Sequence, residues 1–132
     1  MRITVDTNIL IRAVTRDDKK QATAAARLLK DAGTVAVPLP CLCEFVRVLR
    51  QVYSLGQRDI QAALQALLNT GNVAVNRPAV DAGLAVLDAG GDFADGIIAF
   101  EGRWLGGETF VSFDKKAVAL LEKQGLAARV LV

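Results

Sequence analysis

The sequence predicts an α/β fold, a central parallel β-sheet of about five short strands flanked by helices, in a single domain spanning residues 1–132. Two patterns predict it. Short apolar runs alternate along the chain with longer runs whose apolar residues recur at helical spacing. Apolar residues make up 52% of the chain and aromatic residues only 5%. This composition is ample for a core and favours helices packed on a sheet over an all-β sandwich.

The first half of the chain reads as a strand, two helices, a second strand and two further helices. Gly33 is expected to end the Ala-rich second helix. Pro38 and Pro40 stop the second strand, and Gly71 stops the last helix of this half. The predicted strands are residues 3–5 and 35–37, and the predicted helices are residues 8–13, 19–32, 41–53 and 58–68.

The second half continues the alternation of strands and helices. Pro78 suits the first turn of a helix because its missing N–H needs no partner there, and Gly106 with Gly107 ends the next helix. The predicted strands are residues 73–75, 109–111 and 129–132, and the predicted helices are residues 78–87, 94–105 and 115–123. On the earlier helix 41–53, the expected buried stripe consists of Leu42, Phe45, Val46, Leu49 and Tyr53.

Charge and cysteine content exclude several kinds of protein. The net charge is only +2, so no strongly basic tail indicates nucleic acid. Cys41 and Cys43 cannot complete a zinc site without histidine, which the chain lacks, and are expected to be reduced core thiols. No apolar run is long enough to span a membrane, and Asp6 interrupts any signal-like start. We therefore expect a soluble, cytoplasmic protein.

Two acidic residues follow predicted strands and open the next helices. Asp6 comes directly after the first strand, and Asp114 follows the strand at residues 109–111. In parallel sheets, ligands bind outside the carboxyl ends of the strands. Taken singly, each of these residues is also explained as a helix N-cap, an interaction that contributes about 1 kcal/mol.

Three further acids complete the candidate constellation. Asp92 and Asp95 fit a cap with an acidic first turn, but Ile98 and Ala99 share the helical face of Asp95 and predict that this face points inward. A carboxylate on such a face needs a cation or hydrogen-bond donors. Glu44 lies within the helix 41–53, and its alternative explanation is an exposed ion pair with Arg47.

Together the acids indicate a metal-dependent reaction. Mg²⁺ prefers oxygen ligands and binds through a few carboxylates plus water. Since the chain has no histidine to act as a general base, a metal would have to activate the nucleophile. Four metal-bound carboxylates would leave ten acidic residues against 16 basic ones, a balance that suits an anionic partner.

The chain resembles the PIN-domain ribonucleases, and among them the VapC toxins of toxin–antitoxin pairs. Four segments carry the resemblance, in the order of the family: Val-Asp-Thr-Asn-Ile-Leu at 5–10, Cys-Glu-Phe-Val-Arg at 43–47, Asp-Phe-Ala-Asp-Gly-Ile-Ile-Ala at 92–99 and Val-Ser-Phe-Asp-Lys at 111–115. The chain departs from the family at Gly96, where a better helix former is usual and where glycine is expected to loosen the first turn of the helix. It also departs at the segment Pro40-Cys41, where Ser or Thr is common. Neither departure removes an acid.

The resemblance implies a role for each of these residues. Asp6 and Asp95 would be the main Mg²⁺ ligands, with Mn²⁺ as a possible substitute. Glu44 and Asp114 would complete the acidic pocket directly or through water. Asp92 would be auxiliary, and Ser112 would support the site by a hydrogen bond.

The resemblance also implies a substrate and partners. It implies hydrolysis of structured RNA such as tRNA, leaving a 5′-phosphate and a 3′-hydroxyl, a small cognate antitoxin that obstructs the acidic pocket, and a homodimer. The apolar helices from Cys41 to Leu68 could supply the dimer interface or belong to the core. The candidates for gripping the RNA backbone are Arg12, Arg16, Lys19, Lys20, Arg47, Arg50, Lys115 and Lys116.

Two other interpretations stay open at this stage. One is a non-catalytic PIN-like module that binds RNA or a protein without cleaving RNA. The other is a phosphatase with Asp6 as the nucleophile, although the run after Asp6 lacks the second Asp that common aspartyl phosphatases carry two residues on.

Overall fold

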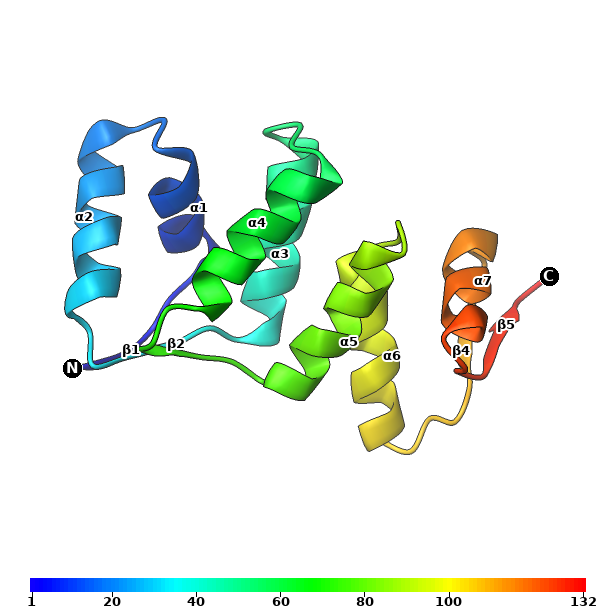
Figure 1. Ribbon diagram of the computed structural model, residues 1–132. Helices are drawn as coiled ribbons and strands as arrows, with labels where there is room; N and C mark the ends of the chain where they lie inside the picture. The colour runs from blue at the N-terminus through cyan, green and yellow to red at the C-terminus, as the bar shows by residue number, and fades with distance from the viewer. The chain divides into compact units, whose positions relative to one another are not determined.

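The computed structural model describes all 132 residues (Figure 1). Its contacts divide the chain into two compact units, an N-terminal unit of residues Met1–Asn76 and a C-terminal unit of residues Arg77–Val132. Each unit is described by itself. No helix in either combines the length and apolar content that crossing a membrane requires.

The N-terminal unit contains a three-stranded parallel sheet with β2 between β1 and β3. Val35 at the centre of β2 is fully buried and is paired with Ile3 on one side and Val73 on the other. The elements of this unit are β1 (Arg2–Thr4), α1 (Thr7–Thr15), α2 (Lys19–Asp31), β2 (Thr34–Ala36), α3 (Leu39–Gln51), α4 (Gln57–Leu68) and β3 (Val73–Ala74).

Helix α3 contributes the largest share of buried side chains to the core of the N-terminal unit. The predicted stripe on α3 is confirmed at its first four positions, because Leu42, Phe45, Val46 and Leu49 are all buried. Tyr53 lies beyond the end of α3 and is only partly buried. Its hydroxyl donates to Asp17 at 2.8 Å instead of entering the core.

Most boundaries in this unit differ from the sequence prediction by one or two residues, and two of the differences have a clear physical reason. Helix α3 begins at Leu39 rather than Cys41, because Pro40 lies in the first turn, where its missing N–H costs no hydrogen bond. Gly33 does not provide a left-handed helix end. Ala32 caps α2 in an extended conformation, and the Gly33 N–H donates to the Met1 carbonyl at 2.8 Å.

The C-terminal unit contains a helix pair followed by a strand–helix–strand segment. Its elements are α5 (Arg77–Asp88), α6 (Phe93–Trp104), β4 (Phe110–Ser112), α7 (Lys115–Lys123) and β5 (Ala128–Val130). Strand β4 pairs with β5 in parallel. Val86 of α5, Ala99 of α6 and Leu121 of α7 meet in a buried cluster, so the helix pair and the strand–helix–strand segment share one core.

Helices α5 and α6 pack closely because of two glycines. A Cβ at Gly96 would overlap the Ala82 carbonyl oxygen, and a Cβ at Gly83 would lie 2.8 Å from the ring of Phe93. The sequence suggested that Gly96 loosens the first turn of its helix. In the structure this glycine is buried, and it permits the close approach of α5 and α6 (Figure 1).

The predicted fold class is confirmed at the level of its elements. Seven helices and five short strands are present, and every strand pairing is parallel. The expected sheet of about five strands is shown in part, as a three-stranded sheet in the N-terminal unit and a two-stranded sheet in the C-terminal unit.

Candidate functional site

Asp6 lies between β1 and α1 and caps the helix. Its carboxylate accepts the N–H of Ile9 at 3.3 Å, the capping interaction that the sequence offered as an alternative to catalysis. The side chain is exposed and lines a hollow of about 450 Å³ between α1 and α2. One carboxylate oxygen held by the helix end leaves the other free toward solvent, so capping and metal binding are compatible at this residue.

Glu44 is held by an arginine on its own helix. Arg47 donates from Nη2 to Oε1 at 2.6 Å and from Nε to Oε2 at 3.1 Å, the i, i+3 pair that the sequence offered as an alternative. These hydrogen bonds, together with the charge of Arg47, lower the pKa of Glu44. The carboxylate is therefore ionised and partly exposed, but both of its oxygens already accept hydrogen bonds from the Arg47 guanidinium.

The C-terminal unit brings three predicted acids near one another. Asp92 caps α6 by accepting the N–H of Ala94 at 2.9 Å, and Asp95 lies in the first turn of that helix. Asp114 caps α7, accepting the N–H groups of Lys116 and Ala117 at 3.0 and 3.1 Å. The Ser112 hydroxyl accepts the Asp114 N–H at 3.0 Å, so Ser112 makes a hydrogen bond that orients this turn.

The ionised form of Asp95 is destabilised by its surroundings. Its carboxyl is half-buried, and its pKa is raised first by that burial and then by the negative charges of Asp92 and Asp114. The ion pairs of the structure involve other acids, namely Asp17, Glu44 and Asp81. A cation placed among these three carboxylates would reverse the repulsion, which is the chemistry that a divalent metal supplies.

The prediction that Asp95 heads an inward-facing apolar face is half wrong. Ala99 is buried, but Ile98 is 56% exposed. The face of α6 that turns inward is built from Phe93, Gly96 and Ile97, because α6 packs on α5 through its glycine. Asp95 lies at the border of that face, which explains its partial burial.

The donor set fits Mg²⁺ better than a softer metal. Its members are carboxylates, and the chain has no histidine. Within neither unit do three metal-ligating side chains converge tightly enough to bind one ion directly. Mg²⁺ tolerates this arrangement because it keeps several of its waters. Asp6 and Glu44 belong to the N-terminal unit, and Asp92, Asp95 and Asp114 belong to the C-terminal unit.

Neither cysteine forms a disulfide, and Cys41 is buried whereas Cys43 is partly buried. Burial raises the pKa of Cys41, an effect that a hydrogen bond with Thr7 opposes and the charge of Asp6 reinforces. A thiol with a raised pKa is a poor nucleophile and a poor metal ligand. This agrees with the expected packing role of Cys41.

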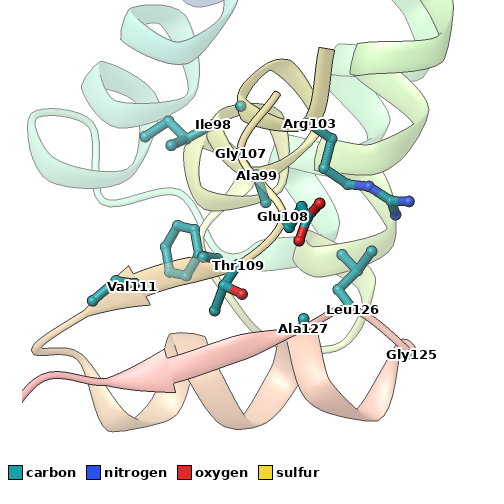
Figure 2. A pocket seen from close by; sticks show the side chains of 12 residues that line it. Ile98, Ala99, Arg103, Gly107, Glu108, Thr109, Val111, Gly125, Leu126 and Ala127 are labelled. Carbon is teal, nitrogen blue, oxygen red and sulfur yellow. The ribbon is translucent and has the colours of Figure 1, made fainter. Parts of the chain in front are cut away.

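A separate hollow of about 460 Å³ lies in the C-terminal unit, and Glu108 is the one acid that lines it (Figure 2). Ile98 and Ala99 of α6 line it together with Leu126 and Ala127, which precede β5 (Figure 2). Thr109, Phe110 and Val111, at the beginning of β4, line it, whereas Asp114 follows the end of that strand. None of the predicted acids lines this hollow.

Two of the basic residues predicted to contact RNA form ion pairs within the protein. Arg12 pairs with Asp17 at 3.0 Å and Arg47 pairs with Glu44 at 2.6 Å, so these two cations are engaged within the protein. Sequence reasoning missed Arg27, which lines a basic surface on α2 with Lys19 and Lys20. Its helical spacing from Lys20, at i+7, is the signal that could have identified it.

Comparison with known proteins identifies the family of the chain. The model of the PIN domain matches residues 3–122, which include all four segments of the acidic constellation and extend through both units. No curated protein matches the chain significantly. PIN domains have a nuclease-like fold and are usually metal-dependent nucleases. On this match, the chain belongs to the PIN domain family.

Proposed function

We propose that this protein is a Mg²⁺-dependent endoribonuclease and the toxin of a type II toxin–antitoxin pair. Its substrate would be a structured RNA such as tRNA. The observation that carries the proposal is the environment of Asp95, a half-buried carboxylate without a paired cation whose pKa is raised by burial and by the charges of Asp92 and Asp114. Such a group is costly to the fold and is typical of a functional site.

Each acid has a distinct task in the reaction. Asp6 and Asp95 are the direct ligands, and Glu44 and Asp114 act as supporting acids, directly or through water. Asp92 is auxiliary, and its carboxylate caps α6. Ser112 orients the Asp114 turn through its hydrogen bond to the Asp114 N–H.

The reaction is the hydrolysis of a phosphodiester. Bound Mg²⁺, or Mn²⁺ in its place, would lower the pKa of a water and offset charge on the phosphate. The carboxylates would hold and orient the metal, and the bond between phosphorus and the 3′ oxygen breaks to leave a 5′-phosphate and a 3′-hydroxyl.

A cognate antitoxin, a homodimer and a cytoplasmic location belong to the same proposal. A short reading frame beside the gene, encoding a DNA-binding N-terminus, would support the toxin assignment.

An RNA cleavage assay with the purified protein tests the proposed nuclease activity. Cleavage is expected with Mg²⁺ and is expected to stop in EDTA. Asp6→Asn and Asp95→Asn should each lower the rate by about a hundredfold or more, since even partners of metal ligands are worth roughly 10–100-fold. Cleavage that persists in both variants would sink the metal-site assignment.

A matched control separates catalysis from helix capping. Asp18 caps α2 by accepting the N–H of Gln21 at 3.0 Å, much as Asp6 caps α1. Asparagine caps about as well as aspartate, so Asp18→Asn removes the same charge and keeps the same type of cap. Asp18→Asn is expected to cleave like the wild type. A comparable loss in Asp18→Asn and Asp6→Asn would reduce Asp6 to a structural residue.

One observation favours a second candidate, a PIN-like module that binds RNA or a protein without cleavage. Both oxygens of Glu44 accept from Arg47, so one of the four acids is already engaged. The cleavage assay distinguishes the two candidates. RNA binding without any Mg²⁺-dependent cleavage would establish the module.

A further inference from the structure

The exposed face of α2 is a basic surface. Lys19, Lys20 and Arg27 line a hollow of about 730 Å³ in which Asp31 is the one acid. Lys20 and Arg27 are seven residues apart, which places them on one face of the helix, roughly 10 Å apart along its axis. Thr23, between them, already donates its hydroxyl to the Lys19 carbonyl at 2.8 Å. The cations therefore dominate the chemistry of this hollow.

None of the acids on or beside α2 forms an ion pair with these cations, including Asp31, which lies four residues after Arg27 in the same hollow. Asp17 accepts hydrogen bonds from Arg12, Thr15 and Tyr53, which together lower its pKa. Asp18 uses its carboxylate to cap α2. No ion pair of the structure involves Lys19, Lys20 or Arg27. This basic surface is thus available to an external anion.

The basic surface is continuous with the hollow that Asp6 lines. Helices α1 and α2 lie side by side (Figure 1), and Asp6, Arg12 and Gln21 line the hollow between them. Ala24 and Leu28 of α2 line both hollows. A ligand chain bound at Asp6 can therefore continue along α2 to the cations without leaving the surface of the N-terminal unit.

We propose that this α1–α2 surface binds the phosphate backbone of the RNA beside the cleaved bond, with Lys19, Lys20 and Arg27 as its main contacts. The inference deepens the proposed function and rests on it for the identity of the polymer. Unpaired ammonium and guanidinium groups are the usual partners of backbone phosphates. Such contacts hold the strand in register and do not select a base sequence. Three cations along one helix match a polyanion better than a single small anion.

The test is RNA binding in EDTA, where cleavage is not required. The wild type and a Lys20→Glu/Arg27→Glu variant are titrated into a fluorescein-labelled single-stranded RNA, and anisotropy is recorded at several salt concentrations. The variant is expected to bind at least tenfold more weakly at low salt. Its dependence of log K on log salt should be shallower by roughly 1.4, since each phosphate contact on a single strand contributes about 0.7.

Matched variants keep the result interpretable. Arg58→Glu/Lys123→Glu changes the net charge by the same amount at exposed positions outside both hollows and is expected to bind RNA nearly as the wild type does. Lys20→Gln/Arg27→Gln removes the cations without adding acids and should show an intermediate loss if folding is intact by circular dichroism.

Three outcomes would overturn the inference. The α2 variants could bind RNA as tightly as the control variant, or they could bind more weakly with an unchanged salt slope. The wild type could also ignore RNA and bind polyglutamate, which would assign the surface to an acidic peptide. The proposed nuclease could fail independently of this result, because it is judged by Mg²⁺-dependent cleavage and this surface by binding without metal.

Discussion

The two units hold their predicted acids in different electrostatic states. In the N-terminal unit, Asp6 is exposed and caps a helix, and Glu44 is paired with Arg47. In the C-terminal unit, Asp95 is half-buried, and the charges that raise its pKa, those of Asp92 and Asp114, have the same sign as its own. The N-terminal acids are stable without a metal, whereas the C-terminal acids repel one another until a cation arrives.

This difference indicates where metal affinity originates. A carboxylate already satisfied by a guanidinium must exchange that partner for the metal, so part of the binding energy is lost. A carboxylate raised in energy by its neighbours regains that energy when a cation binds. The C-terminal acids should therefore contribute more to Mg²⁺ affinity than Glu44 does.

The largest expected effect follows from that ranking. Asp95→Asn should weaken Mg²⁺ binding by more than about a hundredfold, while Glu44→Gln should weaken it by less than about tenfold. Isothermal titration with Mg²⁺ measures both. Asp81→Asn is the control, because Asp81 is an exposed acid of the same unit paired with Arg77 at 3.1 Å. Equal losses for Asp95 and Glu44 would show that the contrast between the units does not extend to metal binding.

A second prediction concerns the helix that presents Asp95. Gly96→Ala should destabilise the C-terminal unit by about 1–3 kcal/mol, because its new methyl group meets the Ala82 carbonyl. Gly102→Ala, on the same helix, meets nothing within 4 Å and should stabilise it by up to about 1 kcal/mol. Urea unfolding measures both changes. If Gly96→Ala proved as stable as Gly102→Ala, the close approach of α5 and α6 would be refuted.

The locally determined parts of the structure could be predicted from the sequence. Helix α7 was predicted at its observed bounds, Lys115–Lys123, and Asp114 caps it. The first four positions of the α3 stripe were also predicted. These features depend on local periodicity and on capping residues within a few positions of the helix end, so the sequence contains them.

The remaining features depend on residues far apart in the chain. Whether Gly96 loosens a helix or permits close packing is decided by Ala82 on α5. The exposure of Ile98 follows from the same packing, which turns a different face of α6 inward. The repulsion at Asp95 requires Asp114, nineteen residues later, to come near it. Local sequence patterns do not determine which distant residues come close together. The sequence therefore predicted which residues form the candidate site but not how they are arranged in space.

A third prediction uses the raised pKa of Asp95. The folded protein holds this proton more tightly than the unfolded chain, so the contribution to stability is full below the ordinary pKa of 3.8 and is lost as pH rises through the raised value. Ionised Asp95 therefore destabilises the metal-free protein at neutral pH. Asp95→Asn should raise the thermal midpoint at about pH 7, and the gain should vanish near about pH 3.

Mg²⁺ provides the complementary measurement for Asp95. Saturating Mg²⁺ at about 100 times its dissociation constant should stabilise the wild type by roughly 2.7 kcal/mol, and the same concentration should do little for Asp95→Asn. A lower midpoint for metal-free Asp95→Asn at neutral pH would mean that the carboxylate stabilises the fold and is not a strained metal ligand.

The smallest expected effect on Mg²⁺ binding concerns the Arg47–Glu44 pair of the N-terminal unit. Arg47→Gln removes the guanidinium that lowers the pKa of Glu44, so that pKa should rise toward its ordinary value of 4.5 in a carboxyl-carbon NMR titration. The freed carboxylate should also tighten Mg²⁺ binding, by less than about tenfold because the pair is exposed. Arg50→Gln, one turn later on α3, loses the same charge without releasing Glu44 and sets the baseline for the charge effect alone. If both variants tighten Mg²⁺ binding equally, Glu44 is an ordinary surface acid, and the metal affinity rests on the other carboxylates.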